Sequence, residues 1–98
     1  MEWMAFVKKE NVRKAEELLR ADFYLAAKQS IGIRDARSLD IDKDGSFFMI
    51  TGTDEGVKKC QDLIKDLVEK VDDSLLQKAK KKLEEEADKA AEGFGGLF

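Results

Sequence analysis

The strongest constraint on the fold is the short run of residues 46–51, which holds four consecutive apolar side chains, from Phe47 to Ile50. Successive side chains of a strand point to opposite faces, so this run favours a strand inside a sheet over one at its edge. The preceding residues alternate apolar and acidic side chains: Leu39, Asp40, Ile41 and Asp42. Between the two runs lies Asp44-Gly45, a pair typical of hairpin turns because glycine tolerates positive φ. The sequence therefore predicts a β-hairpin over residues 38–53.

Two stretches have the three-and-four spacing of amphipathic helices. The first covers residues 11–30, with Asn11 as a candidate N-cap and Gly32 just past its end. Its apolar stripe is Val12, Ala15, Leu19, Phe23 and Ala26. The second follows Thr53, a candidate N-cap, and its stripe is Val57, Cys60, Ile64, Leu67, Val68 and Val71. Residues 30–37 are predicted to form a loop between the first helix and the hairpin.

The two ends of the chain give weaker patterns. Residues 1–9 alternate loosely, which favours a short strand, although the same residues can extend the following helix. A further helix is predicted over residues 75–92, with a thin apolar face made of Leu76, Ala79, Leu83, Ala87 and Ala90. Residues 93–98 are predicted to be a flexible C-terminal tail. Its apolar residues would dock in a groove of a partner or fold back on the core: Phe94, Leu97 and Phe98.

The order of strand, helix, hairpin, helix and helix predicts an α+β fold, in which helices cover a small antiparallel-rich sheet and an extra helix follows. We expect one domain over residues 1–92, because a chain of 98 residues rarely holds two cores. No apolar run approaches the roughly 20 residues of a membrane span. No export signal is visible either, so we expect a cytoplasmic protein without a membrane partner.

The chain lacks histidine and proline and has one cysteine. Without histidine, the usual general base and the commonest metal ligand are absent. Cys60 lies on the apolar stripe of a predicted helix, which favours a small buried side chain over a nucleophile. We therefore expect that the chain is not an enzyme. Abundant Lys and Glu without Pro are typical of heat-adapted proteins, and also of long solvated helices.

One segment resembles a known family. The runs Leu39–Gly45, Met49–Thr53 and Val57–Cys60 are similar to the hairpin and following helix of K-homology (KH) domains. KH domains clamp four nucleotides with a Gly-x-x-Gly loop between two helices. Here Gly32 is the only glycine before the hairpin, so no clamp residue can be transferred. The resemblance implies a degenerate KH-like core, which would serve as a protein-binding or packing module.

The predicted hairpin turn matches the opening of a Ca²⁺-binding loop, with carboxylates at alternate positions followed by glycine: Asp40, Asp42, Asp44 and Gly45. Three such carboxylates can converge on one cation. However, Thr51 stands where an EF-hand has its bidentate glutamate, and the flanks are predicted strands. A solvated acidic turn is therefore the competing interpretation, and Ca²⁺ is the one cofactor that the sequence indicates.

Basic residues are concentrated toward the N-terminus. The first 37 residues carry eight basic and six acidic side chains, whereas the remainder carries ten and fifteen. Six of the basic ones form a candidate nucleic-acid patch: Arg13, Lys14, Arg20, Lys28, Arg34 and Arg37. An isoelectric point near 5.1 argues against strong nucleic-acid binding. Ordinary surface charge is the alternative.

Together these patterns predict a small, non-catalytic binding module that acts by protein interaction or self-association. A weak RNA-binding module that uses the basic residues is the first alternative, and a Ca²⁺-binding protein is the second.

Overall fold

A four-stranded antiparallel sheet forms the centre of the computed structural model, which describes the backbone of residues 1–97 and the side chains of residues 1–85. The strands are β1 (Glu2–Lys8), β2 (Ser30–Asp35), β3 (Gly45–Thr51) and β4 (Val68–Glu69). The helices are α1 (Lys9–Ala21), α2 (Asp54–Ile64) and α3 (Asp73–Leu97), with short 3₁₀ turns η1 (Ala26–Lys28) and η2 (Ala36–Leu39). The predicted α+β class is confirmed.

The strands lie in the order β2-β3-β1-β4, and every neighbouring pair is antiparallel. Together with the chain order β-α-β-β-α-β, this is the ferredoxin-like, split β-α-β arrangement, followed here by α3. Strand β1 pairs with β3 along its whole length, from Glu2 opposite Thr51 to Lys8 opposite Gly45. The predicted N-terminal strand and the interior position of residues 46–51 are therefore both confirmed.

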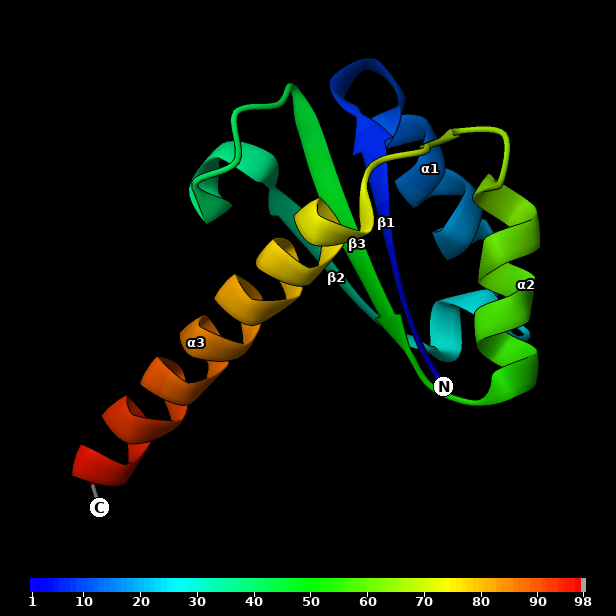
Figure 1. Cartoon of the computed structure of the whole chain (residues 1–98). Coiled ribbons are helices and arrows are strands. Elements are labelled where there is room, and N and C mark those ends of the chain that lie inside the picture. The colour runs from blue at the N-terminus through cyan, green and yellow to red at the C-terminus, as the bar shows by residue number, and fades with distance from the viewer. Residues whose placement is uncertain (98) are drawn as a thin grey trace.

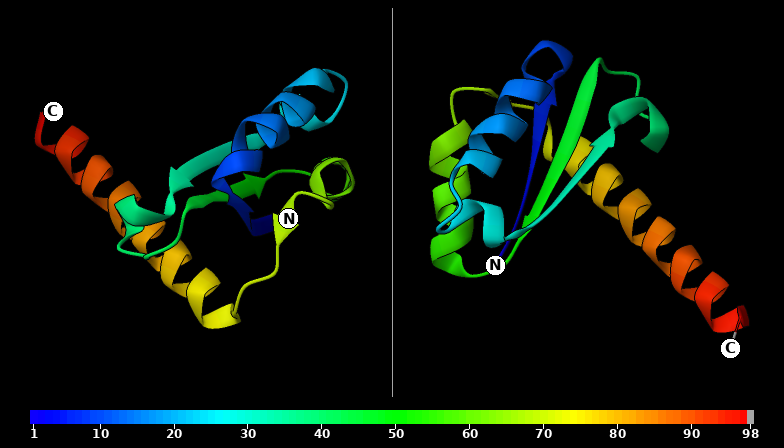
Figure 2. Two further views of the ribbon diagram at one scale, coloured as in Figure 1. Left: turned by 90° about the horizontal axis from the view of Figure 1, so that it is seen from above. Right: turned by 180° about the vertical axis from the view of Figure 1, so that it is seen from behind.

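Helices cover both faces of the sheet (Figures 1 and 2). Helices α1 and α2 pack on one face, where the fully buried side chains form the first core: Val7, Ala15, Leu19, Ala26, Phe48, Ile50, Val57, Cys60 and Ile64. Helix α3 crosses the other face, over a second core of Phe6, Ala36, Leu39, Ile41, Phe47 and Ala79. The rings of Phe6 and Phe47 lie 5.1 Å apart between their centres. Side chains of the central strands thus alternate between two cores.

The predicted hairpin over residues 38–53 is wrong in its first arm. Strand β3 pairs instead with β2, from Ser30 opposite Thr51 to Asp35 opposite Ser46. Residues 36–39 form the turn η2, and Leu39 and Ile41 are buried in the second core. The left-handed residue is Asp40, with φ of 60°, and no glycine has positive φ among the described residues. Gly45 has another role, because a Cβ there would overlap the Val7 carbonyl oxygen and the Phe6 ring.

Both predicted helix boundaries in the first half are also wrong. Helix α1 begins at Lys9 and ends at Ala21, so Asn11 lies inside it and Gly32 lies in β2. The Asp22 carboxylate accepts a hydrogen bond from the Ala26 N–H (3.3 Å), which supports a turn in place of further helix. Residues 30–35 are a strand, where a loop was predicted.

In the second half of the chain, the structure agrees more closely with the elements predicted from the sequence. Thr53 caps α2, since its hydroxyl oxygen accepts a 3.0 Å hydrogen bond from the Gly56 N–H. The helix ends at Ile64, earlier than predicted, and Val68 belongs to the short strand β4. Helix α3 continues past the predicted end at Glu92 to Leu97. The side chains of Phe94 and Leu97, and all of Phe98, lie outside the described residues.

Candidate functional site

The two edges of the sheet differ in length. Strand β4 closes one edge with only two residues, whereas β2 forms the other edge with six. Strand β2 pairs with β3 on its inner side in an unbroken register, and no described strand pairs with its outer side. Ser30, Gly32, Arg34 and Asp35 are exposed, and Ile31 and Ile33 are half-buried. The backbone groups along the outer side of β2 are therefore open to a further strand.

Hollows lie on both sides of this edge. On the α1 side, a hollow of about 180 Å³ is lined by Leu19, Arg20, Gln29 and Ile31, with Glu16 and Ala27 beside them. A second one on that side, of about 270 Å³, includes Arg13 and Asp35. On the α3 side, a groove of about 190 Å³ runs over Ser30, Gly32 and Arg34. Successive side chains of a strand point to opposite faces of the sheet. A strand added beside β2 would therefore place its side chains alternately toward the hollows on the α1 side and toward the groove on the α3 side.

Gly32 shapes the groove on the α3 side. It lies opposite Met49 of β3, and the facing wall of the groove is Leu83 of α3. A Cβ built at Gly32 would meet only the Met49 carbonyl oxygen, at an ordinary 3.7 Å. The absent side chain therefore leaves open space beside the strand, and we call this space the Gly32 groove.

Five of the six candidate basic residues border β2. Arg20 and Arg13 line the two α1-side hollows, Lys28 precedes the strand, Arg34 lies within it and Arg37 follows it. Three of them form exposed ion pairs: Arg13 with Glu17 (3.3 Å), Arg20 with Glu16 (2.8 Å) and Arg37 with Asp44 (2.7 Å). The sixth residue, Lys14, is exposed on α1. The basic residues thus surround an edge and do not form one flat patch.

The three aspartates of the candidate Ca²⁺ loop do not converge. The Asp40 carboxylate forms an ion pair with Lys82 (3.2 Å), and the Asp44 carboxylate forms one with Arg37 (2.7 Å). Asp42 is exposed. Among the residues whose side chains are described, no group of three or more acidic or cysteine side chains is arranged to hold a metal ion. The loop also differs from the predicted hairpin turn, because the turn η2 (Ala36–Leu39) precedes it in place of a strand.

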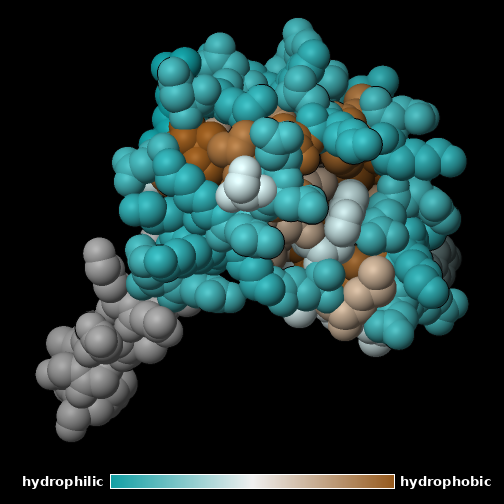
Figure 3. Space-filling view, in the orientation of Figure 1, coloured by the Kyte–Doolittle hydropathy of each residue, from teal (hydrophilic) through white to brown (hydrophobic). Residues whose placement is uncertain are grey.

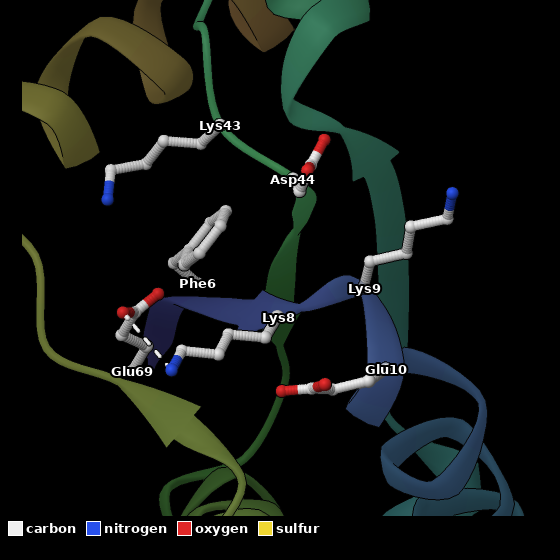
Figure 4. Close-up of a pocket in the computed structure, with 7 residues that line it drawn as sticks. All are labelled: Phe6, Lys8, Lys9, Glu10, Lys43, Asp44 and Glu69. Atoms are coloured by element: carbon white, nitrogen blue, oxygen red, sulfur yellow. Dashed lines mark ion pairs between the residues drawn. The ribbon is translucent and has the colours of Figure 1, made fainter.

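A larger hollow, of about 650 Å³, opens at the end of β1 (Figure 4). Phe6 forms its floor, and the Lys43 ammonium lies 5.3 Å from the centre of that ring. Lys8 pairs with Glu69 across 3.8 Å. Figure 3, in the orientation of Figure 1, shows hydrophobic residues framed by hydrophilic ones in the upper part of the molecule. Three basic and three acidic residues line the hollow, so it favours no ligand of one charge.

Two further predictions concern single residues. Cys60 is fully buried, as predicted, and burial raises the pKa of its thiol, with a smaller contribution from the nearby Asp22 carboxylate. Its Sγ lies 3.8 Å from the Ala26 carbonyl oxygen. Phe23 was expected on the apolar stripe of the first helix, yet it is 75% exposed, and the neighbouring Tyr24 is 89% exposed. Because α1 ends at Ala21, both aromatic rings lie on a turn outside the core.

Comparisons with protein-family models, curated proteins and solved structures found no match to this chain. The KH-like resemblance therefore stays a prediction. No helix in the described part of the chain is long and apolar enough to cross a membrane.

Proposed function

We propose that this chain is a protein-interaction module that binds an extended segment of a partner protein along the outer edge of β2. The observation that carries the proposal is the six-residue unpaired edge with hollows on both of its sides. In strand addition, main-chain hydrogen bonds supply affinity and hollows for alternate side chains supply specificity.

The composition of β2 supports this use. Natural sheets protect their edges with charged side chains (lysine above all), proline, bulges, very short strands or a covering helix. Strand β2 carries two charged residues, Arg34 and Asp35, at its C-terminal end, but its first four residues are uncharged, it has no proline and no lysine, and its pairing with β3 contains no bulge. The opposite edge, β4, has the two-residue length of a protected edge. The difference favours β2 as the binding edge.

The position of α3 favours a single segment over a second copy of the chain. Helix α3 crosses the sheet opposite α1 and continues past β2 (Figures 1 and 2). A single added strand would lie between this helix and the α1 side. A second copy related by a two-fold axis at this edge would bring its own α3 into the same region. We therefore infer an extended segment of another protein as the occupant.

The experiment is selection of a phage-displayed library of random peptides on the immobilised full chain, followed by NMR titration of each enriched peptide. We expect the amides of Ser30–Asp35 to shift and to become protected from hydrogen exchange. The edge-charged variant Gly32→Lys should lose binding, because lysine protects natural edges. Ala21→Lys makes the same charge change at an exposed α1 position and should bind normally.

Three outcomes would contradict the proposal. The library yields no binder, the enriched peptides shift amides of α1 and α2 alone, or Gly32→Lys binds as well as Ala21→Lys. Light scattering adds a fourth: a stable dimer with protected β2 amides and no peptide would make a second copy the occupant. RNA binding and Ca²⁺ binding stay predictions, and titrations of the same sample with each test them.

A further inference from the structure

We infer that the segment bound at β2 continues past the Ser30 end of the strand and places a large apolar side chain against the exposed rings of Phe23 and Tyr24. This inference rests on the proposed function, because it concerns the same bound segment. It is carried by two neighbouring aromatic side chains that the fold leaves in water, on a turn fixed beside the start of β2.

Phe23 and Tyr24 do not contribute to either core. Phe23 is 75% exposed and Tyr24 is 89% exposed, which makes them the most exposed large apolar side chains that the structure describes. The next two residues of the same turn are covered instead, since Leu25 is half-buried and Ala26 is fully buried. Neighbouring large apolar side chains left in water are typical of binding surfaces, and aromatic residues are enriched in protein interfaces. The fold does not require these two rings, so we assign them to binding.

Hydrogen bonds fix the turn that carries the two rings. The Asp22 carboxylate accepts a hydrogen bond from the Ala26 N–H (3.3 Å), and the Leu25 carbonyl oxygen accepts one from the Gln29 side-chain amide (2.9 Å). The Oε1 atom of the same Gln29 accepts a hydrogen bond from the Thr53 N–H (3.1 Å), at the start of α2. The rings are therefore presented on a turn that is already ordered, which lowers the entropic cost of binding.

The turn lies next to the first residue of β2. Gln29, which holds the turn, immediately precedes the strand. Arg20 and Ala27, which flank the turn in the chain, both line the hollow beside Ile31. Figure 2 shows the connection between α1 and η1 beyond the start of β2 and nearly in line with the strand. An extended segment paired with β2 would therefore reach the two rings within a few residues of passing Ser30.

The chemistry of the turn favours an apolar anchor. Beyond Ser30 the strand ends, so ladder hydrogen bonds can no longer supply affinity and side-chain contacts must do so. Burial of a large apolar side chain against Phe23 and Tyr24 removes apolar surface from water on both partners. The neighbouring Asp22 carboxylate disfavours the phosphates of a nucleic acid. An anchor at one end of the segment would also set the register in which the segment pairs with β2.

The test uses peptides enriched on the full chain from a displayed random library of about twelve residues, which is long enough to pair with β2 and pass its end. We expect the binders to share a large apolar residue near one end. Their titration should shift the amides of Phe23–Leu25 together with those of Ser30–Asp35. Replacement of the shared residue by alanine in a synthetic peptide should weaken binding about tenfold, because buried apolar anchors carry much of the affinity of an interface.

Protein variants locate the contact on the chain. The double variant Phe23→Ala, Tyr24→Ala should bind about tenfold more weakly, and its urea midpoint should not change because both side chains are exposed. In this variant the alanine peptide should lose nothing further, since the contact is already absent. Phe23→Leu with Tyr24→Phe keeps two apolar side chains and should retain most of the binding. The control Lys65→Ala, Asp66→Ala removes two adjacent exposed side chains beside β4 without a change in net charge, and should bind normally.

The outcomes separate the inference from the proposed function. If peptides shift the Ser30–Asp35 amides but the double variant binds them normally, strand addition stands and the inferred anchor is wrong. An alanine peptide that loses as much with the double variant as with the unaltered chain also contradicts the anchor. Shifts confined to Phe23–Leu25, or no enriched peptide at all, would contradict both the inference and the proposed function.

Other occupants of the turn give results of their own. Binding of oligouridylate that the double variant loses would assign the rings to base stacking and overturn the inference. A dimer in light scattering that the double variant abolishes would assign the rings to a second copy of the chain, and would overturn it as well.

Discussion

The two faces of the sheet are covered in different ways. On the α1 and α2 face, α1 buries Ala15 and Leu19, and α2 buries Val57, Cys60 and Ile64. On the other face, α3 spans 25 residues but fully buries only Ala79 within its described side chains. Its Leu75, Leu76 and Leu83 are half-buried. The first face therefore holds most of the helix-derived core, while α3 covers the second face loosely and remains available to shape the edge groove.

Leu19→Ala gives the largest expected effect. Leu19 is fully buried between α1 and the sheet, so removal of its side chain loses transfer free energy and leaves a cavity. We expect the free energy of unfolding to fall by about 3 kcal/mol. Urea denaturation followed by circular dichroism measures it. A loss below about 1 kcal/mol would mean that this face does not dominate the stability.

Leu76→Ala makes the same chemical change on the other face. Leu76 is half-buried over the second core, so less apolar surface is exposed and the helix can settle onto the sheet. We expect a loss of about 1–2 kcal/mol in the same urea experiment. A loss equal to that of Leu19→Ala would contradict the difference between the two faces.

Thr53→Ala tests how α2 is held on the first face. Its hydroxyl oxygen accepts from the Gly56 N–H at 3.0 Å, which satisfies one donor of the first helical turn. We expect a loss of about 1 kcal/mol in thermal or urea denaturation. Thr53→Ser keeps the acceptor and serves as the control. If both variants lose the same stability, the methyl group matters and the cap does not.

The elements that the sequence predicted correctly carry local signals. The double-sided apolar run at residues 46–51 requires a central strand, and Thr53 before two acidic residues requires a helix start, whatever the rest of the chain does. The edge strand β2 was missed although Ile31 and Ile33 alternate with Gly32 and Arg34. The run is short, and its exposed residues resemble those of a loop. A two-residue period over residues 30–35 was the signal that could have found it.

The false hairpin arm has a different cause. Leu39 and Ile41 alternate with aspartates as a half-buried strand does, but burial under α3 satisfies the same pattern without a strand. Only tertiary packing separates these two outcomes, because both place the apolar side chains inside and the carboxylates in water. The basic residues give a parallel case. Their gathering around β2 depends on the order of the strands, which no local spacing in the sequence contains.

Lys80→Ala gives the smallest expected effect and sharpens the account of α3. The Lys80 ammonium lies 3.6 Å from the Glu2 carboxylate, and both side chains are more than a third exposed. Solvent screens such a pair, so we expect a loss of less than about 0.5 kcal/mol, which raised salt should remove. Paired urea curves of Lys80→Ala and Glu2→Gln at low and high salt measure it. A loss as large as that of Leu76→Ala would mean that ionic contacts, and not Leu75, Leu76 and Leu83, hold α3 on the sheet.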